Sequence, residues 1–197
     1  GIKKVIMTSV VPEKKNILKQ LMLDAKVEVQ VVGEDIHPDI SNKTEKPETL
    51  GNDRLVAAYE GYSMVQGSAI VIDLGTALTI DFVNSNKEFL GGVIAPGLTA
   101  CAYGLEANAP LLAGYQLFGE VSLPGKNTGQ AIRTGLVYLI SGGIEKVVAE
   151  LKKIDPTAKI IATGGDFERI KDYLSFQAII EPDLLANGMM RLLKLKS

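Results

Sequence analysis

A short segment near the middle of the chain places an acidic side chain, a glycine and a hydroxyl group within four residues. Asp73, Gly75 and Thr76 lie between two alternating apolar runs, 69–72 and 78–82, which predict two strands joined by a tight turn. Backbone N–H and hydroxyl groups donate to phosphate oxygens, and a carboxylate can hold the counter-cation. The turn is therefore a candidate phosphate site, and the alternative is an ordinary hairpin whose glycine permits a positive φ.

The same residue types gather at three other predicted turns, which are 51–54, 125–128 and 163–166. In the first, Asp53 and Arg54 open a predicted helix, where a cap and an exposed ion pair would explain them. In the second, Asn127 and Thr128 precede a long helix, and an N-cap alone would account for both. In the third, the Gly-Gly pair that starts at Gly164 follows a strand and is compatible with a simple tight turn.

Several familiar nucleotide and metal motifs are absent from the sequence. Lys126 follows a glycine as a P-loop lysine does, but Glu120 and Asn127 break that pattern at two places. No G-x-G-x-x-G sequence follows a predicted strand, so a Rossmann dinucleotide site is unsupported. One histidine, His37, and one cysteine, Cys101, are too few for a zinc site or a Ser-His-Asp triad.

The composition is that of a globular protein. Hydrophobic residues make up 46% and charged residues 22% of the 197 residues, which is enough apolar material for a core. The net charge of −2 and the pI near 5.5 give no sign of a nucleic-acid-binding surface. No apolar run is long enough for a membrane span, and a single cysteine cannot form an intrachain disulfide. We expect a cytoplasmic protein that binds neither nucleic acid nor membrane. We also expect its one thiol, at Cys101, to be inert.

Predicted strands and helices alternate along the chain, which is typical of an α/β fold. The predicted strands are 3–11, 27–32, 69–72, 78–82, 88–95, 159–162 and 178–180. The predicted helices are 12–24, 47–65, 96–108, 127–154 and 183–195, with a short helix after 166. The consecutive strands between 69 and 95 should form an antiparallel meander, so we expect a mixed sheet. The break at 66–68 favours two domains, 1–66 and 67–197.

Turns that hold phosphates and a metal, together with a Gly-Gly pair beside adenine, describe the actin-like ATPase and sugar-kinase architecture. More specifically, the sequence resembles the type III pantothenate kinases. The motifs of that family occur in order at 9–12, 51–54, 72–77, 91–97, 125–128 and 163–165. The resemblance implies an actin-like ATPase (ribonuclease H-like) fold with mixed sheets flanked by helices. Residues 1–66 would then be the incomplete remainder of the N-terminal actin-like domain, and 67–197 the C-terminal one.

The resemblance also implies an activity, the ATP-dependent phosphorylation of the primary hydroxyl of pantothenate to 4'-phosphopantothenate. This is the first step of coenzyme A biosynthesis. Asp53 takes the position of the general base, which accepts the alcohol proton as the oxygen attacks the γ-phosphorus. Gly51, Asn52 and Arg54 take positions at the pantothenate site, where a guanidinium suits the substrate carboxylate. Thr128 takes the place of a pantothenate contact that crosses to the partner subunit, so the resemblance implies a homodimer.

The remaining family positions concern ATP and its cations. Gly75 and Thr76 match the second phosphate turn, and Gly164 and Gly165 match the adenosine motif. Asp73 occupies the position that holds a monovalent cation, K⁺ or NH₄⁺. ATP and Mg²⁺ are therefore the expected cofactors, together with that monovalent cation.

The chain departs from the family pattern at its beginning. The family starts with an Asp-x-Gly-Asn-Thr/Ser hairpin that grips ATP phosphate and magnesium, and nothing before Ser9 matches it. We therefore expect that an N-terminal segment is missing and that the chain as written is inactive. The loop 108–116 also differs, because Ala109-Pro110 replaces the usual Leu-Pro after a helix.

Two other functions compete with pantothenate phosphorylation. The first is a non-catalytic accessory or regulatory relative, which would act through protein partners because the acidic balance argues against direct DNA contact. The second is a kinase of the same superfamily with a different small-molecule acceptor, and the Gly51-Asn-Asp-Arg54 signature argues against it.

Overall fold

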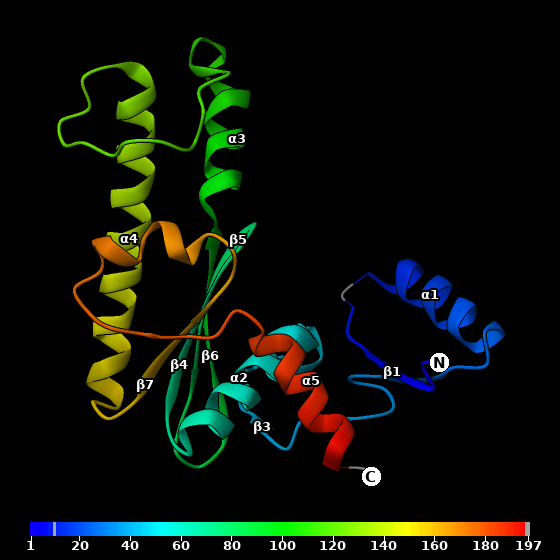
Figure 1. The fold of residues 1–197 in the computed structure, drawn as a ribbon. Helices are drawn as coiled ribbons and strands as arrows, with labels where there is room; N and C mark the ends of the chain where they lie inside the picture. Colours follow the sequence, from blue (N-terminus) through cyan, green and yellow to red (C-terminus); the bar gives the residue numbers. More distant parts are fainter. Residues whose placement is uncertain (10, 196–197) are drawn as a thin grey trace. The chain divides into compact units, whose positions relative to one another are not determined.

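The computed structural model describes residues 1–9 and 11–195, and their contacts group the chain into two compact units (Figure 1). The first unit comprises Gly1–Ala69, Asp81–Gly91 and the chain from Asp183 on. The second unit comprises Ile70–Ile80 and Gly92–Pro182. Each unit takes segments from separate parts of the chain, and the domain boundary expected near residue 66 stays a prediction.

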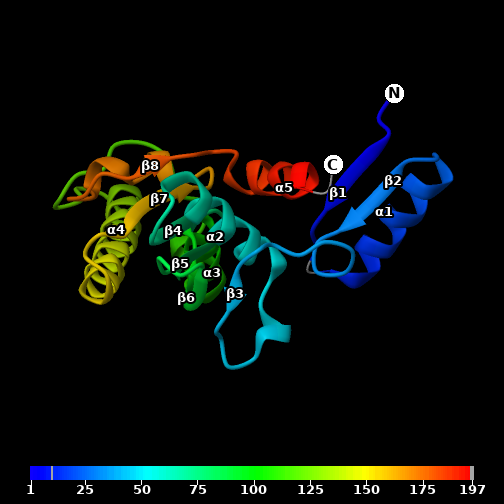
Figure 2. The same ribbon diagram turned by 90° about the horizontal axis from the view of Figure 1, so that it is seen from below.

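The first unit begins with a β-α-β arrangement. β1 (Lys4–Met7) pairs in parallel with β2 (Glu28–Val31), and α1 (Pro12–Asp24) connects them and lies beside β2 (Figure 2). Pro12 stands in the first turn of α1, where a missing N–H leaves no helical hydrogen bond unmade. β1 is shorter than the strand predicted over 3–11. That strand and the motif at 9–12 both include Val10, which lies outside the described residues.

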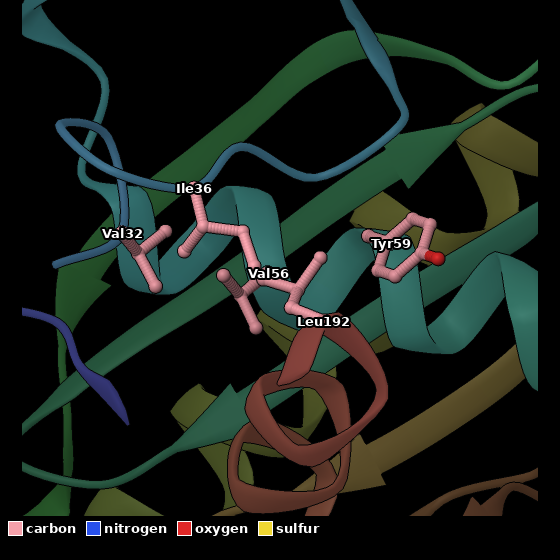
Figure 3. Close-up of a cluster of buried hydrophobic side chains, with 5 residues drawn as sticks. All are labelled: Val32, Ile36, Val56, Tyr59 and Leu192. Carbon is pink, nitrogen blue, oxygen red and sulfur yellow. The ribbon is translucent and has the colours of Figure 1, made fainter. Parts of the chain in front are cut away.

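Two helices complete the core of the first unit. α2 (Asn52–Val65), which follows the 3₁₀ turn Pro47–Thr49, packs along α5 (Leu184–Leu195). Five buried side chains meet between these helices and the segment after β2 (Figure 3): Val32, Ile36, Val56, Tyr59 and Leu192. The helices approach closely because Gly188 offers no side chain. A Cβ at that position would lie 2.8 Å from Val56 Cγ1 and 3.1 Å from Glu60 Cβ.

An ion pair between a buried carboxylate and a partly exposed arginine links the same two helices. Arg191 donates from Nε to Glu60 Oε2 at 2.6 Å and from Nη2 to Glu60 Oε1 at 2.9 Å. The Glu60 carboxylate is almost fully buried, and its hydrogen bonds raise the pKa of Arg191. A bidentate pair of this kind satisfies a charge that burial would otherwise make costly.

The main sheet has the strand order β3-β6-β5-β4-β7-β8. Its strands are β3 (Ser41–Asn42), β4 (Ala69–Leu74), β5 (Ala77–Val83), β6 (Glu88–Pro96), β7 (Lys159–Thr163) and β8 (Ile179–Ile180). Tight turns join β4 to β5 and β5 to β6, and such turns connect antiparallel neighbours. β3 is parallel to β6 and β7 is parallel to β8, so the sheet is mixed as predicted. The predicted α/β class is confirmed, whereas β3 was not predicted.

The helices of the second unit are α3 (Leu98–Asn108) and α4 (Thr128–Ile154), which lie side by side (Figure 1). A 3₁₀ turn, Pro110–Leu112, and an irregular loop connect them. After β7, the predicted short helix is instead two 3₁₀ turns, Phe167–Arg169 and Lys171–Tyr173. No helix in the described part of the chain is long and apolar enough to cross a membrane.

Candidate functional site

The hairpin between β4 and β5 forms as predicted, and its turn is closed by the backbone. The N–H of Gly75 donates to the carbonyl oxygen of Ala77 at 3.0 Å, so this donor closes the turn. Thr76 is exposed at the tip, while Asp73 is half-buried on β4 just before it. The polar side chains therefore stand at one end of the hairpin, and the apolar residues of both strands other than Ala77 are buried in the sheet.

A second segment packs against this turn at Gly97, between β6 and α3. The N–H of Gly97 donates to the carbonyl oxygen of Thr76 at 2.9 Å. A Cβ on Gly97 would overlap the carbonyl oxygen of Gly75, so only glycine fits here. Although 91–97 was recognised as a motif, its sequence did not reveal that Gly97 is the residue in contact with the hairpin.

A third segment reaches the hairpin from the end of β7. Gly164 has a φ of +92°, and a Cβ on it would overlap the carbonyl oxygen of Leu74 and lie 2.6 Å from Asp73 Oδ1. The N–H of Asp166 donates to the same Leu74 carbonyl at 3.0 Å. The structure thus brings together two predicted motifs, 72–77 and 163–166, which are far apart in sequence. Gly164 is more than an ordinary turn glycine, because its backbone covers Asp73 without a side chain.

The carboxylate of Asp73 lies beside backbone groups at the end of β4. Its Oδ1 lies against the bare backbone of Gly164, beside the carbonyl of Leu74. Carboxylate and carbonyl oxygens are the donors that hard cations prefer. Among residues 1–9 and 11–195, no three His, Cys, Asp or Glu side chains form a cluster that could hold a metal ion. Mg²⁺ needs no such cluster, since it commonly keeps waters and binds through substrate phosphates.

A pocket of about 220 Å³ opens beside the Gly-Gly pair. Its polar edge is formed by Thr163, Gly164, Gly165 and Glu168, and its apolar wall by Phe167, Ile180 and Pro182. The hydroxyl of Thr163 donates to the carbonyl oxygen of Pro182 at 3.3 Å, which ties the two sides of the pocket together. Apolar walls with a few polar groups are typical of small-molecule sites.

In the first unit, Gly51, Asn52, Asp53 and Arg54 surround the start of α2. Gly51 is the N-cap residue without a side-chain cap, and Asp53 lies in the first turn. Oδ1 of Asp53 accepts the N–H of Arg54 at 2.9 Å, and the side chain is half-buried. A carboxylate here is favoured by the positive end of the helix dipole.

Arg54 does not form the exposed ion pair that the sequence left open. Its Nε donates to Asp81 Oδ2 at 3.1 Å and its Nη2 pairs with Asp81 Oδ1. The Asp81 side chain is only 2% exposed, and the Phe89 ring lies 5.8 Å from the guanidinium carbon. Sequence reasoning missed Asp81, although one acidic residue in a mainly apolar strand is a signal for a buried cationic partner.

Asn52 is held by a loop that the sequence analysis left unassigned. Gly33 follows β2 with a φ of +89°, and a Cβ on it would lie 2.8 Å from Asn52 Oδ1. The N–H of Gly33 donates to the carbonyl oxygen of Ile36 at 2.8 Å, which closes the loop. The loop backbone therefore limits the space open to the Asn52 side chain.

Thr128 begins α4 in the second unit and is exposed. The N-cap expected at this position is present, because Asn127 Oδ1 accepts the N–H of Gln130 at 2.9 Å. Gly125 allows the preceding turn to touch the helix, since a Cβ there would lie 2.6 Å from the backbone nitrogen of Ala131. The cap accounts for Asn127 and leaves the Thr128 hydroxyl to be explained.

Comparison with known proteins gives consistent relatives. The sequence profile described as type III pantothenate kinase matches residues 1–150. A type III pantothenate kinase from Bacillus cytotoxicus is 34% identical over 195 residues, which cover 97% of this chain and 74% of the relative. A solved structure described as a Baf family transcriptional activator from Campylobacter jejuni superposes with a TM-score of 0.69 at 23% identity. That superposition covers 100% of this chain and 84% of the other.

Proposed function

This chain belongs to the type III pantothenate kinase family, and from that premise we propose how its residues share the reaction. The function is the ATP-dependent transfer of phosphate to pantothenate, as the sequence predicted, and membership of this family implies the actin-like ATPase fold. The assignments of individual residues, the cations, the homodimer and the cytoplasmic location are our proposals.

Asp53 is the general base in this proposal. Its Oδ1 is oriented by the N–H of Arg54, and within the described residues no hydrogen bond occupies Oδ2. Oδ2 can therefore accept the proton of the primary hydroxyl as that oxygen attacks the γ-phosphorus in line.

The turn at 73–76 and the Gly-Gly pair bind ATP in this proposal. Thr76, exposed at the hairpin tip, donates its hydroxyl to a phosphate oxygen, and Gly75 gives the turn its tight shape. Gly164 and Gly165 line the pocket that would take adenosine. Asp73 would hold K⁺ or NH₄⁺. Mg²⁺, when bound with ATP, neutralises charge that develops on the phosphate oxygens.

Arg54, Gly51 and Asn52 form the pantothenate side of the proposal. The guanidinium of Arg54 pairs with the substrate carboxylate, and Gly51 and Asn52 shape the entry to α2. Thr128 adds a contact across a homodimer. The single cysteine, which cannot form an intrachain disulfide, supports a reducing cytoplasmic setting.

The observation that supports the proposal most directly is the convergence of Gly97 and Gly164 on the hairpin that carries Asp73. Both glycines allow backbone-to-backbone approach that any side chain would block. Such close packing is needed where a turn must hold a small anion and its cation in a fixed geometry.

The test is an ADP-release assay with pantothenate, ATP, Mg²⁺ and K⁺ in the full-length protein. Asp53→Asn should lower kcat by about 10²–10⁴-fold without loss of folding, because a general base contributes on that order. Asp39→Asn, at an exposed carboxylate in the same unit, is the matched control and should be unaffected. A folded wild-type protein that releases no ADP with pantothenate would instead favour the accessory role.

A further inference from the structure

Asp81 is a buried carboxylate on β5, whose other residues are apolar except for Thr79. Its neighbours in β5 include Ile80 and Phe82, both buried, and its own side chain is 2% exposed. Placing a carboxylate in such surroundings is unfavourable unless a cation and hydrogen bonds compensate. A sheet that needed only packing would be better served by an apolar residue at this position. Packing of the core therefore does not explain why a carboxylate occupies this position.

The partner of Asp81 is Arg54, and the contact uses one edge of the guanidinium. Nε donates to Oδ2 at 3.1 Å and Nη2 pairs with Oδ1. This side-on arrangement engages two of the five N–H groups of the guanidinium. The second hydrogen on Nη2 and one hydrogen on Nη1 form the end of the guanidinium that does not contact Asp81, and the other Nη1 hydrogen lies on the Cδ side. The centre of the Phe89 ring lies 5.8 Å from the guanidinium carbon, within the range of a cation–π contact.

The same contact separates Arg54 from its neighbour in sequence, Asp53. Adjacent residues on a helix do not face each other, but a long arginine side chain in the first turn can fold back onto a nearby carboxylate. With both oxygens of Asp81 engaged, Arg54 is directed toward β5. Oδ1 of Asp53 accepts the backbone N–H of Arg54 and not its guanidinium.

We propose that Asp81 is a positioning residue, which fixes the guanidinium of Arg54 side-on so that its Nη1 edge receives the carboxylate of the substrate end-on. This inference rests on the proposed pantothenate kinase function and adds a residue and a geometry to it. Pantothenate carries its carboxylate at the end opposite the hydroxyl that reacts. The contact is therefore equally strong before and during phosphate transfer and acts on binding.

The experiment is steady-state kinetics of Asp81→Asn in the full-length protein. The amide keeps the size of the side chain but loses the charge, so the guanidinium is no longer held in place. We expect the KM for pantothenate to rise about tenfold, as for a weakened charged hydrogen bond, while kcat and the KM for ATP change less than about twofold. An unchanged KM for pantothenate would overturn the proposal.

Glu60→Gln is the matched control, because Glu60 is also a buried carboxylate that pairs bidentately with an arginine in the first unit. It should lower the melting temperature and leave the KM for pantothenate unchanged. If Glu60→Gln raises that KM as much as Asp81→Asn does, Asp81 has only a structural role. A double-mutant cycle adds a second readout. On an Arg54→Met background, Asp81→Asn should have almost no further effect on KM if it acts through Arg54.

An NMR measurement separates this inference from the proposed function. The Nε–H signal of Arg54 should be protected from solvent exchange in the wild type and lose that protection in Asp81→Asn. If the wild type shows no pantothenate-dependent turnover, the function and the substrate role of Asp81 are both overturned. If the wild type is active but the Arg54 signal is equally unprotected in both proteins, only the positioning role is overturned.

Discussion

Gly164 and Gly165 are neighbours in sequence, yet their surroundings differ sharply. Gly164 has a φ of +92°, and a Cβ on it would overlap the carbonyl oxygen of Leu74. Gly165 has open space, with no atom within 4 Å of such a Cβ. Of the two glycines of this pair, both of which the sequence assigned to the nucleotide, only Gly164 is therefore required by the packing of the hairpin.

This difference gives a paired prediction. Gly164→Ala should destabilise the protein by about 1–3 kcal/mol through backbone strain and overlap, and it should raise the KM for ATP by moving Asp73. Gly165→Ala should change stability by less than about 0.5 kcal/mol. Urea unfolding and ATP kinetics on both variants make the test. Equal loss of stability in the two variants would contradict the close approach at Gly164.

Cys101 in α3 gives a prediction of pH dependence. Its thiol donates to the carbonyl oxygen of Pro96 at 3.7 Å, and burial raises its pKa. A raised pKa leaves less thiolate at neutral pH, so alkylation by iodoacetamide should be slower than for a free cysteine peptide at pH 7. The rate should increase only as the pH passes above the ordinary thiol range. A rate equal to that of the peptide at pH 7 would show a normal thiol.

At the scale of elements, hydrophobic periodicity predicted the long segments well. The alternating runs around the turn at 75–76 gave β4 and β5, and the spaced apolar residues of 127–154 gave α4. β3 was not predicted, because Ser41 and Asn42 are polar and form a strand only by pairing with β6. The Asp81–Arg54 pair was not predicted for a similar reason. Its partners are 27 residues apart, so the fold brings them together and the local sequence does not indicate the contact. The motifs located the candidate site, and tertiary packing decided which atoms meet there.

The crossing of α2 and α5 depends on Gly188. A Cβ there would lie 2.8 Å from Val56 Cγ1 and 3.0 Å from the Val56 carbonyl oxygen, so Gly188→Ala must push the helices apart. We expect a loss of about 1–3 kcal/mol, measured by urea unfolding. Gly143→Ala in α4, where a Cβ meets nothing within 4 Å, should be neutral or stabilise by up to about 1 kcal/mol. If Gly188→Ala leaves the stability unchanged, α2 and α5 are not in the close contact that the structure shows at Gly188.

At the scale of the whole molecule, the second unit exposes large apolar side chains on adjacent helices. Tyr103 on α3 is 68% exposed and Leu139 on α4 is 75% exposed, in a unit whose helices α3 and α4 are in contact. Apolar side chains exposed on neighbouring helices can form a surface of the kind found at protein interfaces. If the proposed homodimer uses this surface, Leu139→Glu should shift the protein to monomers in sedimentation velocity. Ile154 is 65% exposed on the same helix but lies about 22 Å further along, so Ile154→Glu should leave the dimer intact.

The shared site proposed for the homodimer can be tested by mixing two defective proteins. Asp53→Asn removes the base from its own subunit, and Thr128→Ala removes the contact that would cross to the partner. In a mixed dimer, one site then combines an intact Asp53 with an intact Thr128 from the other subunit, while the second site loses both. Since random exchange puts half of the subunits into mixed dimers, activity should recover to about a quarter of the wild-type value. If the mixture shows only the averaged activity of its components, Thr128 acts within its own subunit and the partner completes no site.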